Sequence, residues 1–381
     1  MWQAADGPNR PNDTRHARVS CGASFVPGQR ATMRAMARHV RIAHAGVRLS
    51  ARIAAAALWL VAIAAPAAAH GTAPDVPPSI GGLLLGWTFA PVPTLTIVAS
   101  LAWWRWAVGR VNAAHPDNPV PRGRSVAFAG GMLAIAFALL SGIERYDTTL
   151  FSIHMVQHLL LTLVAAPLIA LSAPITLLLR LASPGTRRRV VLPVLHSRAV
   201  RFLAFPVVAW LAFAGVMWVS HFSALFDAAL EDPLLHDLEH GLFLGSALLF
   251  WWPAVGADPG PWRLSHPVRA LYTFLQMPQN TFLAVILLNA STPFYPHYVS
   301  LDVAWLPTAL DDQRLAAGIM WLGGDALFIA AVGAIMWGWM RSEEAGQARS
   351  DRRADAELAA IREHEAALSD RRAKERGPAE G

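Results

Sequence analysis

Two pairs of histidines give the sequence its clearest chemical signal. His154 and His158 lie four residues apart at the start of a long apolar run, and His236 and His240 repeat the spacing. Positions i and i+4 share one face of a helix, so each pair would present two imidazoles one turn apart. Imidazole is a good ligand for copper, zinc, iron and nickel. Two such pairs at one surface could form a four-nitrogen metal site.

Further side chains could complete this site. The weaker histidine candidates are His221 and His297. Carboxylates that could orient the rings are Glu144, Asp147, Asp237 and Glu239. Thioether ligands would favour Cu(I), and the methionines concerned are Met155, Met217 and Met320. Taken singly, however, a histidine at a helix mouth is more often an interfacial polar residue, and methionine in a membrane helix mostly packs.

The composition places these histidines in a membrane protein. Of 381 residues, 54% are hydrophobic and only 15% are charged, which is too apolar for an ordinary soluble domain. The apolar residues fall in blocks of roughly 18–25, the length that spans a bilayer. The net charge of +6 therefore indicates cytoplasmic loops rather than nucleic-acid binding. The single cysteine, Cys21, excludes a disulfide within the chain and a cysteine metal cluster.

The apolar blocks predict an all-α bundle of seven transmembrane helices within residues 80–340. Helices are expected because lipid leaves unpaired backbone groups unsatisfied. We expect them near residues 80–104, 125–143, 152–180, 202–220, 237–255, 268–290 and 315–340.

The loops between these blocks predict the orientation. Arginine-rich loops at 105–124, 180–201 and 256–269 alternate with acidic loops. Because positive loops stay in the cytoplasm, the N-terminus is expected outside and the C-terminus inside. The histidines named above then gather on the outer side, close to the surface. The acidic loops there would attract cations.

Both ends of the chain differ from the bundle. Residues 1–32 are expected to be disordered or an upstream extension, and 33–69 resemble a signal peptide with a cut after Ala69. Cleavage would make His70 a new N-terminus, able to bind Cu(II) through its amine and ring; an uncleaved anchor is the alternative. Residues 341–381 predict a charged, partly helical cytoplasmic tail.

Several separate motifs carry a family resemblance. They are Phe151–Leu161, His236 with Glu239 and His240, Phe250–Pro253, Pro293–Tyr298, and Asp312-Gln313 followed by Ala317–Trp321. Together they resemble the CtaG family of cytochrome c oxidase assembly factors, over roughly residues 80–340.

The resemblance implies a bacterial inner-membrane protein needed to make active oxidase, with oxidase subunits as partners. It also implies a role in copper handling, without enzymatic turnover. By the resemblance His154, His158, His236 and His240 would be the metal ligands, with His221 and His297 behind them.

Three other functions remain open from the sequence. A membrane b-type haem protein would use paired histidines as axial ligands, but it needs one from each helix and a wide apolar slot. A copper or cation transporter would need polar residues through the membrane, for which Asp325 and the residues from Gln276 to Asn280 are the hints. A structural scaffold would bind no metal.

Overall fold

The computed structural model describes residues 73–375, and no β-strand occurs among them. The predicted helical class is thus confirmed for this part of the chain. Residues 1–32 and the signal-like segment with its cleavage site lie outside the described residues. The helices, with π-helical stretches marked η, are α2 (Ile80–Leu85), α3 (Pro91–Ala114), α4 (Arg122–Leu140), α5 (Gly142–Tyr146), α6 (Phe151–Leu159), η1 (Leu160–Ala165), α7 (Ala166–Ser172), α8 (Pro174–Leu181), α9 (Pro184–Thr186), η2 (Arg187–Val191), α10 (Leu192–Leu195), α11 (Arg198–Leu203), α12 (Pro206–His221), α13 (Ala224–Glu231), α14 (Pro233–Val255), α15 (His266–Phe274), α16 (Gln276–Leu288), α17 (Pro296–Ser300), α18 (Ala309–Gly318), η3 (Ile319–Gly323) and α19 (Gly324–Glu375).

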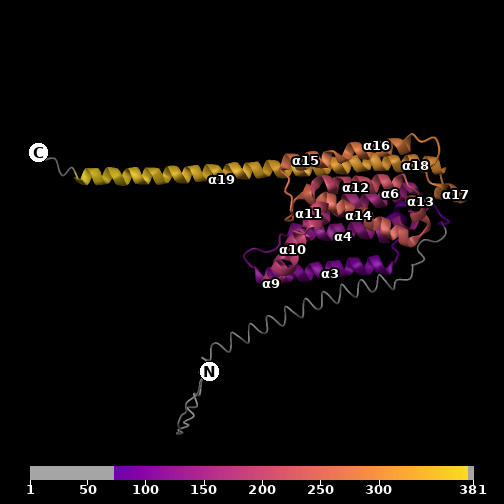
Figure 1. Cartoon of the computed structure of the whole chain (residues 1–381), viewed down its shortest axis with the longest axis horizontal. Coiled ribbons are helices and arrows are strands. Elements are labelled where there is room, and N and C mark those ends of the chain that lie inside the picture. The colour runs from indigo at the N-terminus through magenta and orange to yellow at the C-terminus, as the bar shows by residue number, and fades with distance from the viewer. Residues whose placement is uncertain (1–72, 376–381) are drawn as a thin grey trace, which may run out of the picture. The chain divides into compact units, whose positions relative to one another are not determined.

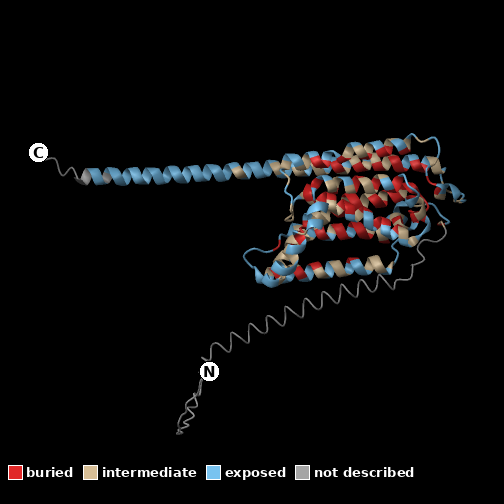
Figure 2. Ribbon diagram, in the orientation of Figure 1, coloured by how far each residue is buried: buried red, intermediate tan, exposed pale blue. Residues whose placement is uncertain are grey.

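The long helices lie side by side, with α14 packed against α12 and α7 and with α4 packed against α7 (Figure 1). The contact between α4 and η1–α7 depends on Gly131. A Cβ added there would meet Ile169 Cγ1 at 2.8 Å and the Ala165 carbonyl oxygen at 3.2 Å. Small residues commonly let membrane helices approach this closely. Buried residues concentrate where the helices face one another (Figure 2).

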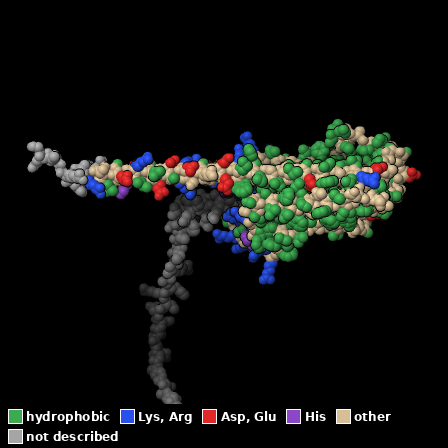
Figure 3. Space-filling view, turned by 90° about the horizontal axis from the view of Figure 1, so that it is seen from above, with side chains coloured by type: hydrophobic (Ala, Val, Ile, Leu, Met, Phe, Trp, Pro, Cys, Tyr) green, Lys and Arg blue, Asp and Glu red, His purple; other side chains and the backbone are tan. Residues whose placement is uncertain are grey.

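Four helical stretches are long and apolar enough to cross a membrane. They are Arg122–Tyr146, Phe151–Leu181, His266–Leu288 and Ala309–Ser369. A fifth results if Pro206–His221 and Ala224–Glu231, bent by 72°, count as one span. On the face shown in Figure 3, hydrophobic side chains cover the bundle and charged groups lie toward its ends. The chain is therefore a multi-span membrane protein, while the count of seven spans stays a prediction.

The boundaries of the first predicted segment were wrong. Instead of one helix over 80–104, α2 ends at Leu85 and α3 runs from Pro91 to Ala114. Proline at the first position starts α3, since its missing N–H is unpaired there anyway. As a result Arg105 and Arg110, which we expected in a loop, lie on the helix.

The predicted third segment, 152–180, is also interrupted. Its π-helical stretch η1 precedes Pro167, whose ring cannot fit a regular α-helical turn. The helix then ends at Ala173, which adopts a left-handed conformation (φ 56°) before Pro174 starts α8. At the other end of the chain, α19 continues without a break into the charged segment, where its side chains are exposed (Figure 2).

Candidate metal centre

Helices α6 and α14 bring the four paired histidines into one cluster. Nε2 of His154 lies 2.8 Å from Nε2 of His158. Across the helix interface, the ring centroid of His154 lies 5.4 Å from that of His236, and His158 lies 5.9 Å from His240. Both pairs therefore point toward the same space between the two helices, as their i,i+4 spacing predicted. We call these four residues the histidine cluster.

Local interactions fix the helix ends that carry the cluster. The Asp232 carboxylate caps α14 by accepting hydrogen bonds from the Leu234 and Leu235 amides at 2.8 and 3.0 Å. The first turn of α6 has no cap of its own, but Asp312 from α18 accepts a hydrogen bond from the Ser152 amide. Because unpaired N–H groups at a helix start need such acceptors, both helices begin at defined residues. These contacts thus fix where the histidines lie along the two helices.

Two carboxylates lie beside the imidazoles. An Asp147 oxygen is 3.8 Å from Nε2 of His236, and a Glu239 oxygen is 3.9 Å from Nε2 of His154. The donor atoms of Asp147, His236 and His240 lie within 4.8 Å of one another, as do those of His154, His236 and Glu239. The Ser220 hydroxyl donates to the other Glu239 oxygen at 2.6 Å. These carboxylates could complete or orient a metal coordination sphere.

The sequence analysis missed Gln157, which connects the cluster to its surroundings. Its amide NH₂ lies 2.7 Å from a Glu144 oxygen, 3.0 Å from an Asp147 oxygen and 3.0 Å from the Ala138 carbonyl oxygen. Its carbonyl oxygen lies 3.0 Å from Nε2 of His240. Gln157 therefore orients both a ring and a carboxylate. Its position between His154 and His158 on one helix face was the signal available in the sequence.

The cluster is more deeply buried than we expected. His154 and His236 are each 0% exposed, whereas the sequence placed them near the outer surface. Short helices cover this end of the bundle, where α13 and α17 lie (Figure 1) and where α5 contacts α6. Phe226 of α13 packs on His154 with ring centroids 4.9 Å apart, and also on Tyr295. Sequence periodicity alone gives no measure of such a cover.

The other predicted site residues have separate places. His221 is buried at the end of α12, where Nδ1 contacts the Met217 carbonyl oxygen at 2.7 Å. Nε2 of His297 instead lies 2.8 Å from the carbonyl oxygen of Thr148, beside the cluster. Asp237, a predicted orienting carboxylate, is exposed. Glu144 and Asp147 adjoin Gln157 as described. The structure thus brings four of the six predicted histidines into the cluster itself.

Several buried polar atoms of the cluster lack a partner. Nδ1 of His154, Nδ1 of His158 and the Glu239 oxygen nearest His154 make no hydrogen bond within the described residues. A buried polar atom without a partner costs free energy, which a bound cation would offset. Burial also raises the pKa of Asp147, in the turn after α5, to about 8. A neighbouring cation would favour its ionised form.

Comparison with known proteins identifies the family of the chain. Residues 102–342 match the family described as cytochrome c oxidase caa3 assembly factor, Caa3_CtaG. The chain belongs to this family. Its resemblance, inferred from the separate motifs in the sequence, is thus confirmed. The matched range includes the whole histidine cluster.

Uncharacterised mycobacterial proteins are among the relatives. Proteins of Mycobacterium bovis and Mycobacterium tuberculosis are each 31% identical over 292 residues, covering 74% of this chain. One from Mycobacterium leprae is 30% identical over the same length. The chain spans only 44% of the length of each of these relatives. No solved structure matches the chain.

Proposed function

We propose that this Caa3_CtaG protein assists the maturation of a haem-copper cytochrome c oxidase by holding copper at the histidine cluster. The observation that carries the proposal is the convergence of two i,i+4 histidine pairs and two carboxylates in a buried space. Within it the donor atoms of Asp147, His236 and His240 lie within 4.8 Å of one another, and so do those of His154, His236 and Glu239. Membership of the Caa3_CtaG family supports cytochrome c oxidase as the protein that receives the copper. The role is one of binding and delivery to oxidase subunits, not of enzymatic turnover.

Copper suits these donors better than most ions. For a given nitrogen and oxygen site, divalent first-row metals bind with increasing affinity up to copper. Copper would be cargo here. The protein's part is to present neutral imidazoles, which His236 and His240 could do while Asp147 and Gln157 hold their rings in place. The buried setting would limit exchange with other metals in solution.

Spacing within the cluster favours a small ion over the alternatives. The ring centroid of His154 lies 4.3, 5.4 and 6.3 Å from those of His158, His236 and His240. Such spacing suits one ion shared by α6 and α14, whereas a porphyrin needs a slot as wide as its ring between two axial ligands. We therefore prefer copper to b-type haem.

We further propose a seven-helix arrangement in the bacterial inner membrane, with the cluster on the periplasmic side. Support comes from the arginine-rich loops that alternate with acidic ones. The N-terminus would then be outside and the charged tail inside. A cut after Ala69 in the signal-like segment would leave the new N-terminus in the periplasm, on the same side as the copper.

The function can be tested in a strain that lacks the gene and depends on the oxidase. We would complement it with the wild type or with His236→Ala/His240→Ala, and measure oxidase activity and copper per haem in the purified oxidase. The proposal predicts that the variant leaves the oxidase copper-deficient and inactive. Added copper in the medium should restore part of the activity.

A matched control removes two exposed histidines, His196→Ala/His364→Ala. It should behave as the wild type does. A cluster variant that reaches wild-type levels in the membrane and still yields a fully copper-loaded oxidase would contradict the proposal.

A further inference from the structure

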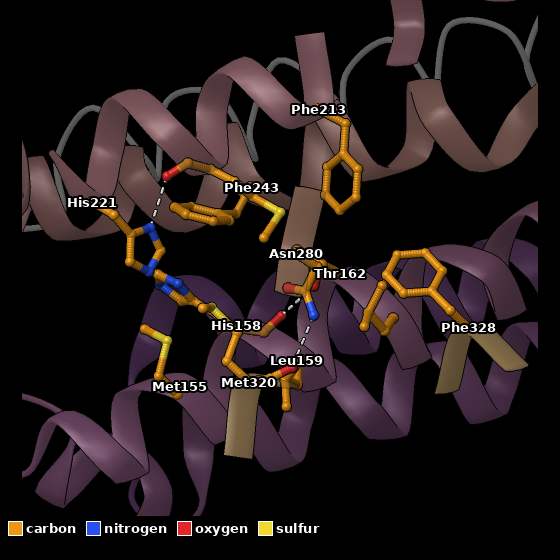
Figure 4. A pocket seen from close by; sticks show the side chains of 12 residues that line it. Met155, His158, Leu159, Thr162, Phe213, His221, Phe243, Asn280, Met320 and Phe328 are labelled. Atoms are coloured by element: carbon orange, nitrogen blue, oxygen red, sulfur yellow. Dashed lines mark hydrogen bonds between the residues drawn. The ribbon is translucent and has the colours of Figure 1, made fainter. Parts of the chain in front are cut away.

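A small cavity of about 20 Å³ adjoins the histidine cluster at His158 (Figure 4). His158 lines both the cluster and this cavity, and His221 reaches the cavity from α12. Three methionines also line it, Met155 from α6, Met217 from α12 and Met320 from η3. The cavity therefore joins imidazole and thioether groups from three separate segments.

The His221 ring is held in one orientation. Its Nδ1 lies 2.7 Å from the Met217 carbonyl oxygen, so Nδ1 carries the proton and Nε2 carries the lone pair in the neutral ring. This Nε2 atom is buried and makes no hydrogen bond within the described residues. A backbone contact at one nitrogen that frees the other is the usual arrangement of a metal-ligating histidine. Figure 4 shows the ring beside that of His158.

Polar side chains also contact two of the three methionines. The Met217 sulfur accepts weak hydrogen bonds from the side-chain amides of Gln276 and Gln279, at 4.0 and 3.8 Å. Asn280 donates to the Met320 carbonyl oxygen at 3.1 Å, within the π-helical stretch η3. Such π-helical turns are frequent at functional sites. Ordinary packing would require neither the amides nor the unpaired imidazole nitrogen.

We propose that Met155, Met217, Met320 and Nε2 of His221 form a second, Cu(I)-selective site. The proposal rests on the copper role given to the histidine cluster. Soft thioether sulfurs select Cu(I), whereas the nitrogen- and oxygen-rich cluster also accepts Cu(II). Because His158 borders both sites, a Cu(I) ion would pass between them by exchanging ligands, with no change in its oxidation state.

The test uses the purified full-length protein loaded with Cu(I) under anaerobic, reducing conditions. Copper content and X-ray absorption, which distinguishes sulfur from nitrogen neighbours, are measured on each sample. The triple variant Met155→Leu/Met217→Leu/Met320→Leu keeps side-chain volume, so its fold should survive. The matched control Met132→Leu/Met277→Leu/Met336→Leu removes three methionines outside the cavity.

Wild-type protein should bind about two equivalents of Cu(I), one of them with sulfur neighbours. The triple variant should lose the sulfur signal and about one equivalent, while the control keeps both. His236→Ala/His240→Ala should keep the sulfur-bound ion. Silver(I), as a redox-inactive probe, should raise the melting temperature of that variant, and not that of a variant that combines it with the triple methionine substitution.

The two proposals fail in different ways. A wild-type copper environment of nitrogen alone, lost on removal of His236 and His240, would overturn the second site and leave the proposed function intact. A sulfur signal that persists in the triple variant would also overturn it. Conversely, copper that depends on the methionines but not on the cluster histidines would overturn the cluster and leave the cavity site.

Discussion

The two ends of α14 both carry buried or half-buried polar groups, yet they differ in how those groups are satisfied. At the Pro233 end lies the histidine cluster. After the Val255 end, Asp258 accepts hydrogen bonds from the Ile175 and Thr176 amides at 2.9 and 2.6 Å. Arg269 donates to the carbonyl oxygens of Ala254 and Val255. We call the region around Asp258 and Arg269, at the C-terminal end of α14, the arginine end.

At the arginine end the charged groups complete helix termini. Asp258 pairs with N–H groups at the start of α8, and Arg269 pairs with carbonyl groups at the end of α14. These are the backbone groups that helices leave without partners. The chain reverses after α14 at Gly256, whose φ of 60° suits glycine. These charged groups therefore stabilise the fold at this end.

At the other end of α14, where the histidine cluster lies, several buried polar atoms have no hydrogen-bond partner. Nδ1 atoms of His154 and His158 and one oxygen of Glu239 are buried without a hydrogen bond in the described part of the chain. At the arginine end one buried donor, Nε1 of Trp252, likewise has no partner among the described residues. The larger number of such atoms at the histidine cluster distinguishes the candidate binding site from the arginine end.

The largest effect should come from removing half of the cluster. His236→Ala/His240→Ala should lower copper affinity by at least ~100-fold, because two of four imidazole ligands are lost. Competition with a colorimetric copper chelator measures this change. An unchanged affinity, with the protein still folded by circular dichroism, would mean that α14 does not bind the metal.

A smaller effect is expected from a residue that only orients ligands. Gln157→Ala should lower copper affinity about 10–100-fold, because it releases the His240 ring and Asp147 from their shared partner. The control Gln347→Ala changes an exposed glutamine on α19 and should have no effect. Equal affinities in the two variants would show that Gln157 serves packing alone.

The arginine end should respond in stability and not in metal binding. Asp258→Ala removes the acceptor at the start of α8 and should lower the free energy of unfolding by about 1–2 kcal/mol. Copper content should stay at the wild-type level. Thermal unfolding in detergent and metal analysis of the same sample check both parts. Loss of copper without loss of stability would contradict the purely structural role of Asp258.

The smallest effect is expected at His297. Its Nε2 contacts the Thr148 carbonyl oxygen, so His297→Asn should change copper affinity by less than about threefold. The same chelator competition resolves the difference. A loss as large as that of the double histidine variant would place His297 among the ligands after all.

The sequence predicted the cluster well because helix periodicity is local. The spacing of His154 and His158, and of His236 and His240, placed each pair on one face without knowledge of the fold. Counting loops predicted that both pairs lie on the same side of the membrane, and the structure shows that the two faces meet. The carboxylates Asp147 and Glu239 were also expected, since they lie next to these helix ends in the chain.

The sequence could not predict what depends on tertiary packing. The burial of His154 comes from Phe226, which is distant in the chain. Gln157 lies between His154 and His158 in the chain, but its partners Glu144 and Ala138 come from other helices. The left-handed turn at Ala173 and the split before Pro91 depend on backbone conformations that hydropathy does not describe. Periodic patterns identify which residues share a helix face. The burial of a site and the interruption of a helix depend on contacts between residues far apart in the chain.

The central claim is that the histidine cluster binds copper. The most direct measurement is the metal content of the purified full-length protein from copper-supplemented cells, beside His154→Ala/His158→Ala. We expect about one equivalent of copper or more per wild-type protein, and a loss of about one equivalent in the variant. Equal copper in both samples, or none in either after loading with Cu(I) under reducing conditions, would contradict it.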